Sequence, residues 1–314
     1  SMEDAEGYLV GTPHKGMRAM FVMMNEARLS VGIEGLSLSD AAYQEALAFS
    51  KERRQGRSLN PKRNEVDADA DRILVHPDVR RLLLKQKSTI EAMRGVATFI
   101  SKHIDLSHHH PDEKQREISD DMVALLTPVV KSFFTEIGFL NTSDAMQLCG
   151  GIGYTSEIPI EQYMRDVRIA MIYEGTNHVQ AMDLVGRKLT KAGGRMIRRF
   201  GKSVEILLTE CAADERLLEF VGPTKEAADT LTKMTMHMAQ QGMADQEAAM
   251  AMASEYLNVF GYVTFAYSWL AQCKLAISRD DTQSKAKLKT ARFFYKHVLP
   301  GIESHKQIML QGKD

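Results

Sequence analysis

Apolar side chains recur at helical spacing along most of this chain. The first such segment begins at Met17, and a second ends near Arg53. Arg28 lies on the apolar stripe of the first segment, and Arg53 lies at the end of the apolar face of the second. The pattern therefore predicts two successive helices, each with an arginine on its apolar face.

The helical pattern continues after this point, with polar and glycine-rich interruptions. A polar stretch over residues 56–71 predicts a loop insertion, and residues 7–13 predict a short strand. Further helical segments are predicted over residues 75–103, 119–148, 159–172, 176–185 and 196–314. We therefore predict an all-α fold, with a helical bundle over residues 17–194 and a helical C-terminal extension over residues 195–314.

Composition narrows the class of protein. Hydrophobic residues make up 44% and charged residues 26%, which is typical of a globular protein. A net charge of -1 argues against a nucleic-acid-binding protein. The 3 cysteines have no CxxC spacing, so we expect neither a disulfide framework nor a zinc site, and a reducing, cytoplasmic location. No run of about 18 uncharged apolar residues occurs, so we expect no membrane span.

Glu174 is the first candidate for chemistry. It precedes Gly175 and Thr176 at a predicted helix start, where backbone N–H groups are free and Thr176 is expected to cap the helix. Such N–H groups can bind an oxygen that gains negative charge while the carboxylate accepts a proton. The neighbouring Ile172 and Tyr173 are expected to desolvate the acid. The alternative is an ordinary helix-start glutamate that interacts favourably with the helix dipole.

A glycine cluster that begins at Gly150 and Gly151 is the second candidate. It matches no known phosphate-binding glycine pattern, so a helix cap competes with close backbone approach to a cofactor. Arg28 and Arg53 have two explanations of equal weight, pairing with a buried acid or reaching a phosphate or carbonyl. Three histidines at residues 108–110 lack further ligands nearby and predict a solvated loop, not a metal site.

Taken together, these segments resemble the acyl-CoA dehydrogenase family. Residues 147–154 resemble its flavin-contacting glycine motif, and residues 173–176, followed by Gln180, resemble its catalytic-base motif. Residues 51–56 resemble its segment that binds the FAD pyrophosphate. Residues 165–166 also fit the family pattern, and the order and spacing of the set make the resemblance specific.

The resemblance covers residues 7–190, and it also implies what the segments at the two ends of the chain are. Residues 1–16 are expected to be a remnant of a preceding β-domain and a tag. The rest resembles the helical extension of larger bacterial members, and residues 73–81 resemble the subgroup of 3-methylmercaptopropionyl-CoA dehydrogenases. Departures are a missing phenylalanine between Gln55 and Gly56 and the polar insertion that follows.

The resemblance implies a reaction and a set of site residues. Glu174 would remove the α-proton of an acyl-CoA thioester while the β-hydrogen leaves as hydride to FAD, giving a trans-2-enoyl-CoA in fatty acid β-oxidation. Electrons would pass to an electron-transferring flavoprotein, and the parent would be a homodimer or homotetramer. Implied FAD contacts are Arg53, Gln147, Gly150, Gly151, Thr176 and Gln180, and implied substrate contacts are Asn25, Arg28 and Gly175.

Because the family's N-terminal helical domain and most of its β-domain are missing, we expect a C-terminal fragment that is inactive alone. Three alternatives share parts of the pattern. An acyl-CoA oxidase would pass electrons to oxygen. A DNA-binding flavoprotein homologue would need a basic C-terminal region, whereas residues 196–314 carry about as many acids as bases. A helical assembly module would need no active site.

Overall fold

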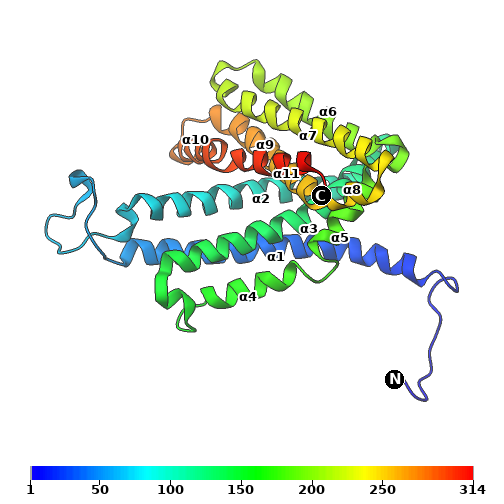
Figure 1. The fold of residues 1–314 in the computed structure, drawn as a ribbon, viewed down its shortest axis with the longest axis horizontal. Coiled ribbons are helices and arrows are strands. Elements are labelled where there is room, and N and C mark those ends of the chain that lie inside the picture. The colour runs from blue at the N-terminus through cyan, green and yellow to red at the C-terminus, as the bar shows by residue number, and fades with distance from the viewer. Residues whose placement is uncertain (1, 314) are drawn as a thin grey trace.

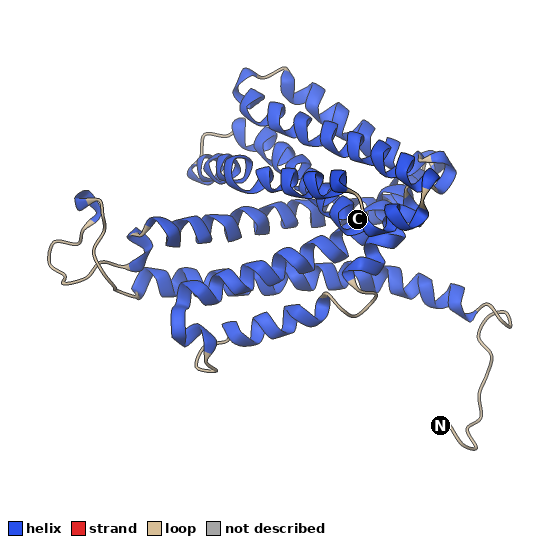
Figure 2. Cartoon of the chain, viewed as in Figure 1, coloured by secondary structure: helices blue, strands red, loops and turns tan. Residues whose placement is uncertain are grey.

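The fold is known from a computed structural model that describes residues 2–313. The chain is 81% helical and forms no strand within these residues, so the predicted all-α fold is confirmed (Figure 2). The N-terminal bundle consists of α1 (Gly16–Glu52), α2 (Pro77–His109), α3 (Glu113–Cys149), α4 (Ile160–Ala170) and α5 (Asn177–Asp183). The extension consists of α6 (Arg195–Ala212), α7 (Leu218–Ala244), α8 (Gln246–Ala251), α9 (Ala253–Ile277), α10 (Thr282–Phe293) and α11 (Ile302–Gln311).

The two helices predicted before residue 53 are one continuous helix, α1, which packs along α3. Glycines allow the close approach. A Cβ atom on Gly35 would lie 2.8 Å from the carbonyl oxygen of Phe134, and one on Gly138 would lie 2.6 Å from the carbonyl oxygen of Gly35. The prediction of two helices was wrong, because α1 continues through Gly32 and Gly35, which pack against α3 and do not break the helix.

The central helix, α3, contacts α1, α2, α4, α5, α6 and α9. Contrary to the sequence-based expectation, one segment of the described chain, 113–154, is long and apolar enough to cross a membrane by length and composition alone. In the structure 72% of its most apolar window is buried by protein. We therefore attribute this hydrophobicity to the core of the fold.

The extension packs on the bundle chiefly through α9 (Figure 1). The side chain of Trp269 is completely buried, and its indole N–H donates a hydrogen bond to the carbonyl of Ser88 on α2 at 3.1 Å. One turn of α2 further, the Ser268 hydroxyl donates to the carbonyl of Ala92 at 3.0 Å. Buried apolar side chains of both parts belong to one hydrophobic core. The boundary near residue 194 remains a prediction.

A second connection joins α3 to α6 through charge. Asp121 on α3 has a side chain that is only 1% exposed. Its carboxylate accepts hydrogen bonds from Arg195 Nε at 2.7 Å and Nη2 at 2.9 Å, and from Arg199. Two guanidinium groups therefore hold the start of the extension against the bundle.

The strand predicted over residues 7–13 is not formed. The segment before α1 runs away from the body of the molecule, and Tyr8, Leu9 and Val10 are exposed (Figure 1). A strand needs a partner for its backbone hydrogen bonds, and the described chain offers none to this segment. The prediction was therefore wrong for this chain.

Two predicted loops have different outcomes. Residues 56–71 do form a loop, organised around Asp71, whose carboxylate accepts the backbone N–H groups of Ser58 and Glu65 at 2.7 Å each. These hydrogen bonds lower the pKa of Asp71. Histidines 108 and 109 instead form the last turn of α2, so the loop prediction was wrong there. No cluster of potential metal ligands occurs among residues 2–313.

Candidate functional site

The loop between α4 and α5 carries Glu174 in a constrained backbone conformation. Glu174 and Gly175 have φ angles of 56° and 84°, in the left-handed region that favours glycine. The backbone N–H of Asn177 donates to the carbonyl of Met171 at 3.1 Å and closes the loop. Thr176 caps α5 by accepting the N–H of Val179 at 3.3 Å, as predicted. The loop therefore presents the acid from a fixed turn.

Arg28 and Gln180 hold this turn from either side. Arg28 Nε donates to the Glu174 carbonyl at 3.3 Å, and Gln180 Nε2 donates to the same oxygen at 3.1 Å. Arg28 also lies 3.7 Å from the carboxylate of Asp183 on α5, and only 6% of the residue is exposed. Both explanations offered for Arg28, a buried acid and a carbonyl, therefore describe its contacts. Asn25 lies one turn earlier on α1 and is exposed.

Two polar atoms of this region are buried without a hydrogen-bond partner in the described chain. They are Oε2 of Glu174 and Oε1 of Gln180. Buried polar atoms are normally paired, so each has capacity for a ligand or a water molecule. Ile172 and Tyr173, the residues expected to desolvate the acid, are themselves 48% and 40% exposed, and their effect on the acid stays a prediction.

Lys131 is the site residue that the sequence reasoning missed. It lies in the middle of α3, its side chain is completely buried, and Nζ donates to the amide oxygen of Asn177 at 3.2 Å. Burial and the neighbouring Arg28 lower the pKa of Lys131 to about 8, and Glu174 opposes this shift. A lysine inside an apolar helical segment was the available signal, since lysine is rarely fully buried.

Four other predicted residues meet at the C-terminal end of α3. They line a pocket of about 740 Å³ and are Arg53, Gln147, Gly150 and Gly151. Gly150 has a φ of 62° and caps α3, as the cap hypothesis requires. Gly151 has no such conformation, and a Cβ atom there would meet no atom within 4 Å. The chain's own packing does not require glycine at 151, which leaves room for a ligand close to the backbone.

The predicted residues thus form two clusters, one around Glu174 and one around Arg53. Arg28 and Arg53 belong to different clusters. Arg28 lies on α1, and Arg53 follows directly after the end of the same helix. At a rise of about 1.5 Å per residue, the 25 positions between them span roughly 37 Å. The two clusters therefore lie far apart on one chain.

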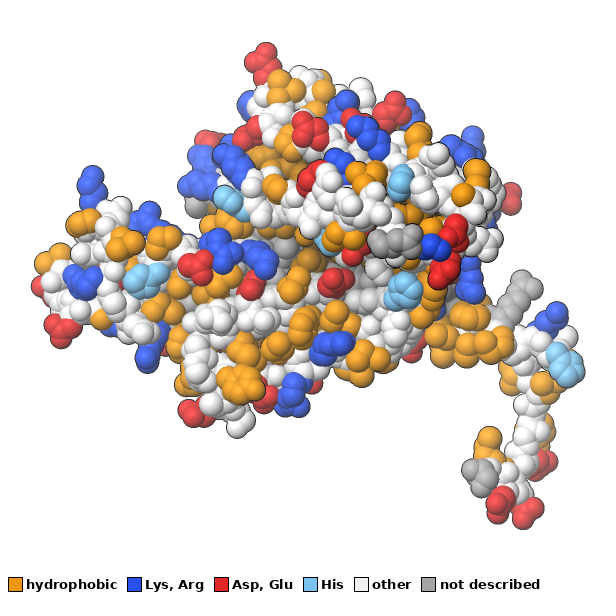
Figure 3. Space-filling view, in the orientation of Figure 1, with side chains coloured by type: hydrophobic (Ala, Val, Ile, Leu, Met, Phe, Trp, Pro, Cys, Tyr) orange, Lys and Arg blue, Asp and Glu red, His pale blue; other side chains and the backbone are white. Residues whose placement is uncertain are grey.

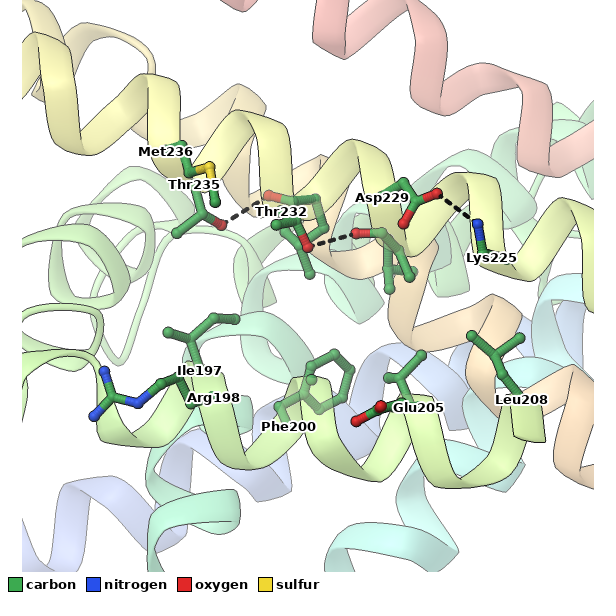
Figure 4. Close-up of a pocket in the computed structure, with 15 residues that line it drawn as sticks. Ile197, Arg198, Phe200, Glu205, Leu208, Lys225, Asp229, Thr232, Thr235 and Met236 are labelled. Carbon is green, nitrogen blue, oxygen red and sulfur yellow. Dashed lines mark hydrogen bonds and ion pairs between the residues drawn. The ribbon is translucent and has the colours of Figure 1, made fainter. Parts of the chain in front are cut away.

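Another pocket, of about 410 Å³, lies between α6 and α7 in the extension (Figure 4). None of the predicted residues lines it. The charged side chains at its edge include Lys225 and Asp229, which pair with each other at 3.3 Å, while Thr232 and Thr235 bond to their own helix. Because its polar groups already have partners, it does not compete with the Glu174 cluster as a reaction site.

Comparisons with known proteins show which family the chain belongs to. Residues 14–189 match the family described as acyl-CoA dehydrogenase, C-terminal domain, and residues 200–314 match acetyl-CoA dehydrogenase C-terminal like. A 3-methylmercaptopropionyl-CoA dehydrogenase of Ruegeria pomeroyi is 35% identical over 95% of this chain and 51% of its own length. A broad-specificity linear acyl-CoA dehydrogenase of Mycobacterium tuberculosis is 30% identical over 97% of this chain and 52% of its own length.

Solved structures share the fold. An acyl-CoA dehydrogenase from Bacillus anthracis, complexed with FAD, superimposes with a TM-score of 0.75 at 18% identity, covering 95% of this chain and 50% of that chain. The chain spans about half the length of the curated relatives it matches. Family match, relatives and fold agree, and the chain belongs to the acyl-CoA dehydrogenase family.

Proposed function

We propose that this chain is the C-terminal half of an FAD-dependent acyl-CoA dehydrogenase in which Glu174 is the catalytic base. The single observation that carries the proposal is the buried, unpartnered Oε2 of Glu174 on a turn fixed by Arg28 and Gln180. A carboxylate oxygen without a partner is free to accept a proton from a substrate carbon. Relatives named as acyl-CoA dehydrogenases support the same assignment.

The residues present fit FAD. Gln180 has a buried amide oxygen without a partner, and Thr176 lies beside it at the start of α5. Arg53 stands in a pocket with Gly151, where a guanidinium suits a pyrophosphate and a bare backbone permits close approach. When bound, FAD supplies the acceptor for the β-hydrogen as hydride. The separation of the two clusters favours a homodimer or homotetramer in which Arg53 serves the cofactor site of a neighbouring subunit.

The chain's own residues would act on the thioester in a defined order. Asn25, Arg28 and Gly175 would provide and support the surface on which the acyl-CoA lies. The Glu174 carboxylate would remove the α-proton, and its backbone N–H would polarise the thioester carbonyl. Loss of the β-hydrogen then gives a trans-2-enoyl-CoA, as in the β-oxidation of fatty acids. An electron-transferring flavoprotein is the proposed electron acceptor, and the cytoplasm is the proposed location.

Exposed apolar surface supports the assignment to a larger protein. Apolar side chains at the N-terminal end of α1 are exposed (Figure 3), and Met17, Val22 and Met23 are each more than 60% exposed. Ile169 at the end of α4 is half exposed as well. Surfaces of this kind mark sites covered by another domain or subunit. We therefore propose that the chain alone lacks dehydrogenase activity.

The visible spectrum of the whole protein tests the function. We expect a flavin spectrum that bleaches when a suitable acyl-CoA is added without oxygen. Glu174→Gln should retain the flavin, but its rate of bleaching should fall at least about 10³-fold, because a single protein group accepts the proton. Glu161→Gln, the same change on α4 in an ion pair with Arg165, is the matched control and should bleach normally. A wild-type protein that binds no FAD would contradict the proposal.

A further inference from the structure

Lys131 is a buried cation that the proposed reaction does not use. The structure encloses its side chain completely, in the centre of α3. Removing an ammonium from water costs free energy unless its environment compensates. The polar partner of Nζ is the neutral amide oxygen of Asn177, at 3.2 Å. One neutral acceptor leaves two N–H groups of the ammonium for other contacts.

Asn177 connects this lysine to the loop that carries the acid. Its amide oxygen also accepts the Thr135 hydroxyl at 3.3 Å, and its amide nitrogen donates to the Ser132 carbonyl at 3.3 Å. Its backbone N–H closes the loop on the Met171 carbonyl at 3.1 Å. Three residues of α3, Lys131 among them, therefore fix the residue that starts α5 and ends the loop.

The charges that act on Lys131 come from α1 and from the loop before α5. The cation Arg28 on α1 lowers the pKa of Lys131, and the anion Glu174 on the loop raises it. Asp183 on α5 lies 3.7 Å from Arg28, 3.5 Å from Arg187 and 3.9 Å from Lys188, so its charge is shared by these three cations. Glu174 keeps its buried Oε2 without a hydrogen-bond partner. The carboxylate of Glu174 is therefore the anion whose charge Lys131 can balance.

We propose that Lys131 is a positioning residue of the Glu174 site, which fixes the loop through Asn177 and keeps the Glu174 side chain in its ionised form. This inference rests on the proposed function, because only an ionised Glu174 can accept the α-proton. The interaction is reciprocal, so Lys131 favours the charged form of Glu174 as much as Glu174 favours that of Lys131. Burial and Arg28 lower the pKa of Lys131 to about 8, while Glu174 raises it.

The electrostatic part can be tested on the chain itself, without activity. NMR of ¹³C-labelled lysine, with the Lys131 signal assigned by its loss in Lys131→Arg, gives the pH midpoint of Lys131. We expect a midpoint near 8, against about 10.4 for an ordinary lysine. Glu174→Gln should lower the midpoint by about one pH unit, and Arg28→Gln should raise it. The matched control Glu161→Gln should leave it unchanged.

Two results of this titration would overturn the proposal. One is a midpoint near the ordinary lysine value in the wild-type chain. The other is a midpoint that Glu174→Gln does not move. Both midpoints are measured on chains that keep Lys131, and Lys131→Arg, which keeps the charge, serves only to assign the signal.

The functional part is tested on the whole protein by the rate of flavin bleaching in a single turnover. Lys131→Met should lower this rate at least tenfold near pH 7 while the affinity for the acyl-CoA changes less than about threefold. Lys131→Arg, which keeps the charge, should recover most of the rate. Equal rates in wild type and Lys131→Met would overturn the proposal. A wild-type protein that is never bleached would instead overturn the proposed function, while the titration still decides the coupling.

Discussion

The residues around Glu174 include a buried charge, Lys131, that lowers the stability of the folded chain. Lys131 is charged near neutral pH inside the core, and its direct partner is the neutral amide of Asn177. A methionine of similar length would fill the same space without a buried charge. Retention of the lysine is therefore better explained by its effect on Glu174 than by packing, as expected where activity and stability compete.

Replacing Lys131 by methionine should stabilise the chain at pH 7, by about 1 kcal/mol or more in the free energy of unfolding. The difference in the free energy of unfolding between Lys131→Met and the wild-type chain should depend on pH with a definite sign. Between about 8 and 10.5 the unfolded chain binds a proton at Lys131 that the folded chain does not, so wild-type stability rises with pH across this window. Lys131→Met lacks this rise. Urea unfolding at pH 7 and pH 10 measures it, and a destabilised variant at pH 7 would indicate a purely structural lysine.

Gly175 offers a second test at the scale of one residue. Its φ of 84° is unfavourable for any other residue, and a Cβ atom would lie 2.8 Å from Nε2 of Gln180. Gly175→Ala should therefore cost about 1–2 kcal/mol in stability and displace the Gln180 amide from the Glu174 carbonyl. Gly151→Ala, where a Cβ atom has open space, is the matched control and should cost less than about 1 kcal/mol in this chain. Equal losses in the two variants would contradict the argument.

Local chemistry is what the sequence predicts well at this scale. Thr176 caps α5 because its hydroxyl and the N–H of Val179 are three residues apart, which the sequence alone specifies. The contacts of Arg28 could not be derived in this way. Its partners Glu174 and Asp183 lie about 150 positions later, and only the packing of α1 and α5 on α3 brings them together. Lys131 stands out in the sequence as a lysine inside an apolar segment, but its partner Asn177, 46 positions later, could not be derived from the sequence.

Helix pairing in this molecule depends on small residues that periodicity treats as interruptions. Gly35 on α1 and Gly138 on α3 face each other, and each leaves room for a carbonyl oxygen of the other helix. Hydrophobic spacing predicted the existence of these helices because long apolar stripes dominate it. It did not show that the two apolar segments of α1 form one helix, because a glycine that serves close packing and a glycine that ends a helix look alike in one sequence.

The link between α3 and α6 carries a prediction at the scale of elements. Asp121→Ala removes the buried acid that Arg195 and Arg199 share, and it leaves the two guanidinium groups with only the more exposed Glu117 as an acidic partner. We expect a loss of about 2–3 kcal/mol in the free energy of unfolding, measured by urea titration. Asp229→Ala breaks an exposed pair with Lys225 on α7 and should cost about 0.5 kcal/mol or less. Similar losses in both variants would show that Asp121 is an ordinary surface acid.

The whole molecule has one core that crosses the predicted boundary near residue 194. Phe134 of α3 and Phe265 of α9 pack with ring centres 5.9 Å apart and ring planes tilted by 57°, and Trp269 lies against α2. In addition, His178 on α5, two residues after Thr176, contacts the Ser254 hydroxyl on α9 at 3.0 Å. The extension therefore supports the helix that carries candidate cofactor contacts. Sequence periodicity could place helices in both parts, but it had no means to pair α9 with α2 and α5.

A shared core predicts that bundle and extension unfold together. The chain has a single tryptophan, Trp269, which lies buried between α9 and α2 and so reports on their contact. Urea unfolding followed by tryptophan fluorescence and by far-ultraviolet circular dichroism should give coincident transitions with the same midpoint. A chain ended at residue 194 exposes the surface that α9 covers, and it should lose cooperative unfolding and aggregate. If fluorescence changes at lower urea than circular dichroism, the extension unfolds first and the two parts are separate cooperative units.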